Sequence, residues 1–269
     1  MRGRRVSRYS PLEPVESILV ADVGNSRIGL GRWDADGLGS VARVSALDDD
    51  AWTEAFTHIW PEARDGGSRA IVISSVSPEP ARRLADQLLD LFGIEALFIR
   101  DDLPLPMEVD LLNPEEVGVD RVCSAAAAFE RLKTACAVAT FGTAITVDCV
   151  SEDGHFLGGA ILPGLRMSCR ALHEFTARLP LVTPGLPDDV IGRSTQDAIL
   201  NGVIHGAIGA VRELVERYAT SLKRWPTLVM TGGDAALLMP HVDFVDAVVP
   251  DLGLIGAALA YRRAAGEPA

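Results

Sequence analysis

Turns that combine glycine with polar side chains follow three apolar segments of the sequence. Asp22-Val-Gly-Asn-Ser follows the first segment, Phe141-Gly-Thr-Ala the second and Thr231-Gly-Gly-Asp the third. A glycine directly after a buried strand lets backbone N–H groups approach an anion, because no Cβ atom stands in the way. Taken singly, each turn is more typical of a hairpin or a strand-to-helix connection. All three in one chain favour a site that holds phosphate groups.

A candidate acid–base residue lies between the first two turns. The segment NPEEVGVDRVCSAAAAFERL, residues 113–132, places Asp120 next to Arg121 directly before an alanine-rich stretch of helical composition. A carboxylate beside a guanidinium group suits a base that deprotonates a hydroxyl group, with a neighbour that holds an anion. The same pattern fits a structural role in which Asp120 caps the helix. The local sequence leaves both interpretations open.

The elements that position these residues form two similar sets. The strand–glycine turn–strand unit at 18–31 recurs at 135–150, nearly half the chain later. Strands and helices alternate after each unit, and this order predicts an α/β fold built from two related halves. In the first half we expect helices at 52–63 and 79–92 and strands at 70–76 and 96–100. In the second half we expect a strand and turn at 158–164, helices at 166–177 and 195–218, a surface loop at 179–189, a strand, turn and helix at 227–238, and a terminal helix at 252–263 that packs on this half.

Composition excludes some classes of function. The formal net charge of −12 argues against non-specific binding to nucleic acid, which needs clustered Lys and Arg. No stretch approaches the roughly 20 apolar residues that span a bilayer, so we expect no membrane partner. The arginine-rich start has no apolar segment of the secretory type, and we expect a flexible tail over residues 1–17. Four cysteines without CxxC spacing predict reduced core residues in a cytoplasmic protein.

Five motifs, taken in order, resemble those of the type III pantothenate kinases, members of the actin, sugar-kinase and Hsp70 superfamily. No single motif is decisive, but the set is specific. The resemblance implies two duplicated ribonuclease-H-like domains, at 18–117 and 118–269, with an ATP cleft between them. The matching segments are Asp22-Val-Gly-Asn-Ser26, Pro114 to Arg121, Gly142-Thr-Ala144, Gly158 to Gly164 and Gly192-Arg-Ser-Thr195.

The same resemblance implies ATP-dependent phosphorylation of pantothenate to 4'-phosphopantothenate, the first step of coenzyme A biosynthesis. Asp120 would be the general base on the primary hydroxyl group of pantothenate, and Asp22 is able to hold Mg²⁺ through water. A homodimer is implied as well. The residues implied in ATP binding are Asp22, Val23, Gly24, Asn25, Ser26, Arg27, Ile28, Gly29 and Thr143, and those implied in pantothenate binding are Gly118, Val119, Asp120, Arg121 and Thr195.

Two positions depart from the family pattern. Thr140 stands where the family generally has an aspartate that binds a potassium or ammonium ion, and a hydroxyl group is a far weaker cation ligand than a carboxylate. We therefore expect a lost or altered monovalent-cation site. Leu111 stands where the family often has a substrate-contacting tyrosine. These departures leave two alternatives open: a kinase for another small hydroxy acid, or a non-catalytic family member that acts as a regulatory accessory factor.

Overall fold

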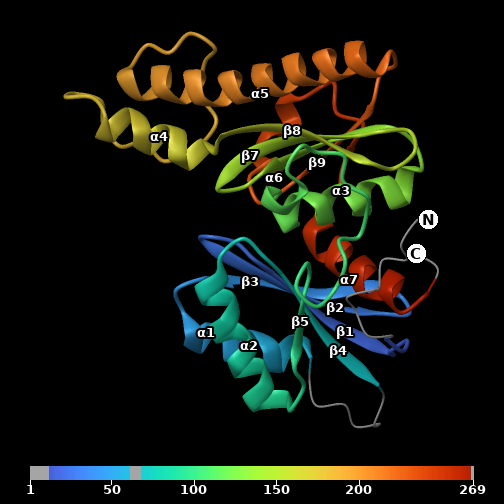
Figure 1. The fold of residues 1–269 in the computed structure, drawn as a ribbon. Helices are drawn as coiled ribbons and strands as arrows, with labels where there is room; N and C mark the ends of the chain where they lie inside the picture. The colour runs from blue at the N-terminus through green and yellow to red at the C-terminus, as the bar shows by residue number, and fades with distance from the viewer. Residues whose placement is uncertain (1–11, 61–67, 268–269) are drawn as a thin grey trace. The chain divides into compact units, whose positions relative to one another are not determined.

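The computed structural model describes residues 12–60 and 68–267, which divide into two compact units. The first unit contains the described residues up to Glu108, together with Asn113–Glu130 and the residues from Leu252 on. The second unit contains Val109–Leu112 and Arg131–Asp251. Each unit has its own sheet (Figure 1). Each sheet has five strands, and each unit has its own hydrophobic core.

The sheet of the first unit has the strand order β3-β2-β1-β4-β5. β1, β2 and β3 are antiparallel neighbours, whereas β4 and β5 run parallel to β1. Helices α1 and α2 cover one face, and α3 and α7 cover the other. The bounds are β1 Ser17–Val23, β2 Arg27–Asp34, β3 Gly37–Ser45, α1 Asp49–Ile59, β4 Arg69–Ser75, α2 Pro78–Phe92, β5 Ala96–Phe98, the 3₁₀ turn Pro114–Glu116, α3 Val119–Leu132 and α7 Leu252–Ala264.

The sheet of the second unit has the order β10-β9-β6-β7-β8. β6, β7 and β8 are antiparallel neighbours, and β9 and β10 run parallel to β6. Helices α4, α5 and α6 pack on one face of this sheet. The bounds are β6 Cys136–Phe141, β7 Ala144–Val150, β8 Phe156–Pro163, α4 Leu165–Glu174, α5 Thr195–Leu222, β9 Thr227–Thr231, α6 Ala235–Leu238, the 3₁₀ turn Met239–His241 and β10 Ala247–Val248.

The two sheets are copies of one topology. β1 to β5 correspond to β6 to β10 in strand order and in direction, so the predicted duplicated α/β fold is confirmed. Each glycine turn closes a hairpin at the same place in its unit, with residues 24–26 between β1 and β2 and residues 142–143 between β6 and β7. In each unit, predicted site residues therefore lie in the turn of a β-hairpin.

Two helices lie in a different unit from the one that the sequence predicts. The predicted second domain begins at residue 118 and includes the terminal helix, yet α7 and all of α3 up to Glu130 belong to the first compact unit. Their residues Cys123 and Leu254 pack in one cluster with Ile18 and Val20 of β1. β1 is apolar on both faces, so its second face needs this cover. The predicted boundary at 117/118 and the predicted packing of the terminal helix on the second half therefore differ from the structure.

The segment before β1 is also ordered where the structure describes it. Leu12 and Val15 pack against the cluster formed by α3 and α7. The hydroxyl group of Tyr261 donates a hydrogen bond to the carbonyl oxygen of Glu13 at 2.9 Å. The prediction of a flexible tail is therefore wrong for residues 12–17, and its remaining part, residues 1–11, lies outside the described residues.

Helix α5 is long and apolar enough, by length and composition alone, to cross a membrane, which contradicts the expectation from the sequence. Its apolar character has a different origin, because Ile199, Ile204 and Val211 lie in the core of the second unit. The exposed side of its first half carries small residues, including Gly202 and Gly206. The helix therefore combines a buried apolar face with an exposed side on which glycines are placed in the first half and charged residues in the second half.

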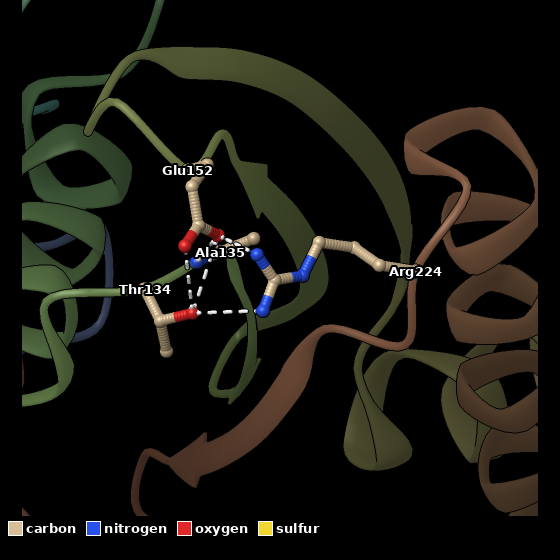
Figure 2. Close-up of polar contacts among 4 residues, drawn as sticks. All are labelled: Thr134, Ala135, Glu152 and Arg224. Carbon is tan, nitrogen blue, oxygen red and sulfur yellow. Dashed lines mark hydrogen bonds and ion pairs between the residues drawn. The ribbon is translucent and has the colours of Figure 1, made fainter.

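A cluster of polar contacts joins three connections within the second unit (Figure 2). Glu152, in the turn after β7, accepts hydrogen bonds from the backbone N–H of Ala135 at 3.0 Å and from the hydroxyl group of Thr134. The guanidinium group of Arg224, which follows α5, donates to Glu152 and to Thr134. These contacts lower the pKa of Glu152, and the hydrogen bond from the Ala135 N–H has the largest effect, followed by that from Arg224. They fix the start of β6, the strand that leads to the Gly142 turn.

Candidate active site

Asp22 is the polar end of an apolar strand. Side chains alternate along β1, so Ile18, Val20 and Asp22 share the face that α3 and α7 cover. On the neighbouring parallel strand, Ser74 is the register partner of Asp22, and its hydroxyl group donates a hydrogen bond to Oδ1 of Asp22 at 3.1 Å. Ser74 is fully buried, whereas Asp22 is only partly buried.

Asp120 lies in the first turn of α3 and does not cap it, because the helix already begins at Val119. The N-cap interpretation is therefore wrong. Oδ1 of Asp120 accepts a hydrogen bond from the backbone N–H of Arg121 at 2.9 Å. A Cβ atom at Gly118 would lie 2.6 Å from the same oxygen, so the carboxylate keeps this place only with a glycine at position 118.

The two carboxyl groups influence each other. The pKa of Asp22 is raised to about 7, mainly by burial and next by the negative charge of Asp120, while the hydrogen bond from Ser74 acts in the opposite direction. Burial also raises the pKa of Asp120, against the Arg121 N–H and the Arg121 charge, which favour its ionised form. Two neighbouring acids with raised pKa values are suited to accept a proton or to share a cation.

Arg100 fixes the segment that leads into Gly118. Arg100 follows β5 with a φ of 90°, and its guanidinium group donates to the carbonyl oxygens of Pro114, Glu115 and Val117, the last at 2.7 Å. One side chain thereby holds the 3₁₀ turn just before α3. Sequence reasoning missed Arg100 and Ser74, because neither belongs to a motif and their partners are distant in the sequence.

The predicted nucleotide-binding residues of β1 and β2 fall into two groups. Asn25, Ser26 and Arg27 are exposed at the tip of the hairpin, where the N–H of Gly24 donates to the carbonyl oxygen of Arg27 at 3.0 Å. Val23 and Ile28 are fully buried core residues, so only their backbone is available to a ligand. Gly29 faces the side chain of Leu254, which gives this position a packing role.

Glycines converge on the turn of the second unit. A Cβ atom at Gly164 would lie 2.3 Å from the carbonyl oxygen of Thr143, and one at Gly232 would lie 2.3 Å from that of Phe141. Gly142, Gly164 and Gly232, which come from three separate glycine-containing segments of the sequence, therefore lie at the same end of the sheet. Thr143 itself is exposed. Thr195 is the exposed first residue of α5, behind the N-cap Ser194.

Thr140 occupies in the second unit the place that Asp22 occupies in the first. Each lies two residues before the glycine of its hairpin, and the register partner of Thr140 on the parallel strand is Thr231, as Ser74 is for Asp22. The Thr140 Oγ1 atom is buried and has no hydrogen-bond partner among the described residues. The other departure from the family pattern, Leu111, lies against Gly158 in the second unit.

Comparison with known proteins decides the family. A sequence model described as type III pantothenate kinase matches residues 18–217. The chain is 36% identical to the type III pantothenate kinase of Geobacter sulfurreducens, over 91% of this chain and 98% of the relative. It is 33% identical to that of Geobacillus kaustophilus, over 91% and 97% of the two chains. The chain belongs to the type III pantothenate kinase family.

Solved structures support the fold of this pantothenate kinase family member. A Campylobacter jejuni protein described as a Baf family transcriptional activator is similar with a TM-score of 0.56 and 22% identity, over 91% of this chain and 97% of that chain. The ethanolamine utilization protein EutJ of Carboxydothermus hydrogenoformans is similar with a TM-score of 0.50 and 14% identity, over 94% and 92%. At these identities the similarity concerns the fold alone.

The raised pKa of Asp22 predicts a pH-dependent effect of Asp22→Asn on stability. The folded kinase holds this proton with a pKa of about 7, against 3.8 for an unperturbed aspartate. The carboxyl group therefore favours folding most at pH values below 3.8 and loses this contribution as the pH rises through about 7. Since Asn is neutral at every pH, the thermal midpoint of Asp22→Asn relative to the parent should rise between these two values and level off above them. A difference that is the same at every pH would contradict this environment for Asp22.

Proposed function

We propose that this family member phosphorylates pantothenate with ATP and uses Asp120 as the general base. Membership in the pantothenate kinase family supports the reaction, the first step of coenzyme A biosynthesis. The observation that carries the assignment of the base is the space that Gly118 leaves for the Asp120 carboxylate at the start of α3. Because burial raises the pKa of Asp120, the group binds a proton more strongly than an exposed aspartate does.

In the proposed reaction, Asp120 accepts the proton of the primary hydroxyl group of pantothenate. The hydroxyl oxygen then bonds to the γ-phosphorus of ATP while the bond to the leaving ADP oxygen breaks, in line with the attack. Arg121 lies next to the base and is proposed to hold the pantothenate carboxylate, as a guanidinium group suits a carboxylate. Gly118, Val119 and Thr195 are proposed as further contacts of pantothenate.

The glycine turns at Gly24 and Gly142 are proposed to contact the phosphates of ATP. Exposed Asn25 and Ser26 support this role in the first unit, and exposed Thr143 supports it in the second. Backbone N–H groups at such turns stabilise the negative charge that moves during phosphoryl transfer.

The carboxyl pair of the first unit fits Mg²⁺ by its chemistry. No group of three His, Cys, Asp or Glu side chains within residues 12–60 and 68–267 could hold a metal ion. One or two carboxylates suit Mg²⁺, which keeps most of its water and phosphate ligands. Asp22 would hold the ion, and the ion would neutralise charge on the transferred phosphoryl group.

The residues at Thr140 do not fit a monovalent cation. The position carries a neutral hydroxyl group whose oxygen is buried, whereas the structurally equivalent Asp22 carries a carboxylate. We therefore propose that this enzyme binds nucleotide without help from potassium or ammonium ions, and no step of the reaction is assigned to such an ion.

A homodimer is proposed through the second unit. Large apolar side chains are exposed there, with 101% exposure at Leu112 and 85% at Phe175. Exposed apolar surface of this kind marks interaction sites. On the outer side of α5, Cβ atoms at Gly202, Gly206 and Gly209 would meet nothing within 4 Å, so the backbone of a second helix is able to approach closely.

A cytoplasmic location is proposed from the free, buried state of all four cysteines.

Asp120→Asn tests the assignment of the base. The substitution keeps the size of the side chain and removes the proton acceptor, so we expect turnover to fall about 10²–10⁴-fold. ADP release measured in a coupled assay, with and without pantothenate, gives the rate. Parent-like turnover in a folded Asp120→Asn protein would contradict the assignment, and ADP release by the parent with another small hydroxy acid but not with pantothenate would contradict the substrate.

Thr140→Asp tests the cation proposal. The substitution places a hard anionic oxygen where the family generally has one, so K⁺ should now tighten the binding of a non-hydrolysable ATP analogue. Calorimetric titrations in KCl and in NaCl measure this, with Thr140→Asn as a control of the same shape without the charge. The parent and the control should bind equally in both salts. Strong activation of the parent by K⁺ would show that other ligands complete the site.

Gly206→Leu tests the proposed dimer. Space is open around Gly206, so the side chain should not disturb the fold of the protomer, but it would keep a second helix away. We expect the parent to be a dimer and Gly206→Leu a monomer in size-exclusion chromatography with light scattering. Ser221→Leu, on an exposed position near the end of the same helix, is the control and should leave the dimer intact. A monomeric parent, or a dimeric Gly206→Leu protein, would contradict this interface.

A further inference from the structure

We propose that Ser74 and Gly253 are positioning residues that hold the carboxyl group of Asp22 in one orientation for the reaction. The inference rests on the proposed function, in which Asp22 lies at the phosphate side of the site. Neither residue belongs to a motif that the sequence offered. Both reach Asp22 from parts of the chain that are distant in sequence, Ser74 from β4 and Gly253 from the first turn of α7.

Ser74 fixes the first oxygen of the carboxyl group. Along β4 the residues Ala70, Val72 and Ser74 alternate onto the face covered by α3 and α7, where the first two are apolar core residues. A fully buried hydroxyl group on such a face has to find a hydrogen-bond partner. Its partner is Oδ1 of Asp22, at 3.1 Å across a pair of parallel strands in register. Rotation of the carboxyl group would break this bond and leave the hydroxyl group unpaired.

Gly253 confines the second oxygen. A Cβ atom at this position would lie 3.1 Å from Oδ2 and 3.5 Å from Cγ of Asp22, and 3.7 Å from the hydroxyl oxygen of Ser124. The backbone of α7 therefore forms a wall beside the carboxyl group, and only glycine leaves the group in its place without a shift. One oxygen is held by a hydrogen bond and the other stands against the helix backbone.

A fixed orientation matters for a group on the phosphate side of a phosphoryl transfer. The protein contributes to this reaction mainly by position and electrostatics, and small displacements of a charged group cost rate. A carboxyl group held from both sides loses little conformational freedom when ligands arrive. Ser74 and Gly253 would thus act on catalysis through Asp22 and without contact to either substrate.

The neighbouring Ser75 provides a matched control. Its hydroxyl group donates to main-chain carbonyl oxygens, 3.0 Å from that of Ser77, and accepts from the Ser77 N–H at 2.9 Å. Ser74→Ala and Ser75→Ala therefore remove the same atom one residue apart, from a carboxyl partner in one case and from main-chain partners in the other. We expect Ser74→Ala to lower kcat about tenfold, as for the loss of one hydrogen bond to a charged group, with the KM for pantothenate within about twofold.

Gly253→Ala is the second variant, and its added methyl group should also lower kcat while the KM for pantothenate is kept. Ser75→Ala should leave both constants within about twofold, even if its thermal midpoint falls. A folded Ser74→Ala protein with the kcat of the parent would overturn the role of Ser74. Equal losses of kcat in Ser74→Ala and Ser75→Ala would indicate a general effect on β4 and would overturn it too.

A double-mutant cycle separates positioning from a structural effect. If Ser74 acts through Asp22, Ser74→Ala should lower kcat in the parent but have little further effect in Asp22→Asn. Full additivity of the two losses would overturn the proposal. The same cycle, measured as calorimetric affinity for Mg²⁺ and a non-hydrolysable ATP analogue, needs no pantothenate. A parent that binds nucleotide but does not phosphorylate pantothenate would contradict the proposed function while this cycle still tests Ser74, and a parent that binds no nucleotide would contradict both.

Discussion

Two neighbouring carboxyl groups beneath the covered face of one sheet are the constraint on which the first unit depends. Burial makes ionisation of both groups costly and raises the pKa of Asp22 and of Asp120, and the charge of Asp120 adds to the effect at Asp22. The structure offsets the cost with specific donors, the Ser74 hydroxyl group for one acid and the Arg121 N–H for the other. A pair of partly buried acids is a poor choice for stability, even with the charge of Arg121 beside Asp120. It is a good choice for a site that takes up a proton and a metal–phosphate complex.

The duplicated topology places different side chains at equivalent positions of the two units. The backbone of the two sheets corresponds strand for strand, so Asp22 and Thr140 have equivalent places, as do Ser74 and Thr231. The first unit holds a charge at this place and a hydroxyl donor beside it. The second unit holds hydroxyl groups only, and one of them, that of Thr140, is buried without a partner among the described residues. The hairpin turn is common to both units, and the strand residue two positions before its glycine is charged in the first unit and neutral in the second.

How much of this could be predicted from the sequence depends on the range of the interaction. The glycine hairpins and the strands around them are local features, and the sequence predicts them correctly, whereas Asp120 lies in the first turn of α3 and not before it. The packing of α3 and α7 on the first sheet is not local, because it arises from the need of β1 for cover on both faces. The domain boundary was therefore misplaced. The roles of Ser74 and Arg100 stayed hidden for the same reason, since their partners lie 52 and 14 to 17 residues away in the chain.

The terminal helix α7 contributes both to the hydrophobic core and to the surroundings of Asp22. Leu254 of α7 fills the space that Gly29 leaves on β2, while Gly253, one residue earlier, leaves space for the Asp22 carboxyl group. Leu252, Gly253 and Leu254 therefore alternate a large side chain with a glycine at the start of α7. The same turn of the helix packs in the core and confines the Asp22 carboxyl group. A substitution that loosens α7 would move this confining backbone before it exposed much of the core. The first unit thus places its acid with a segment that follows the second unit in the sequence.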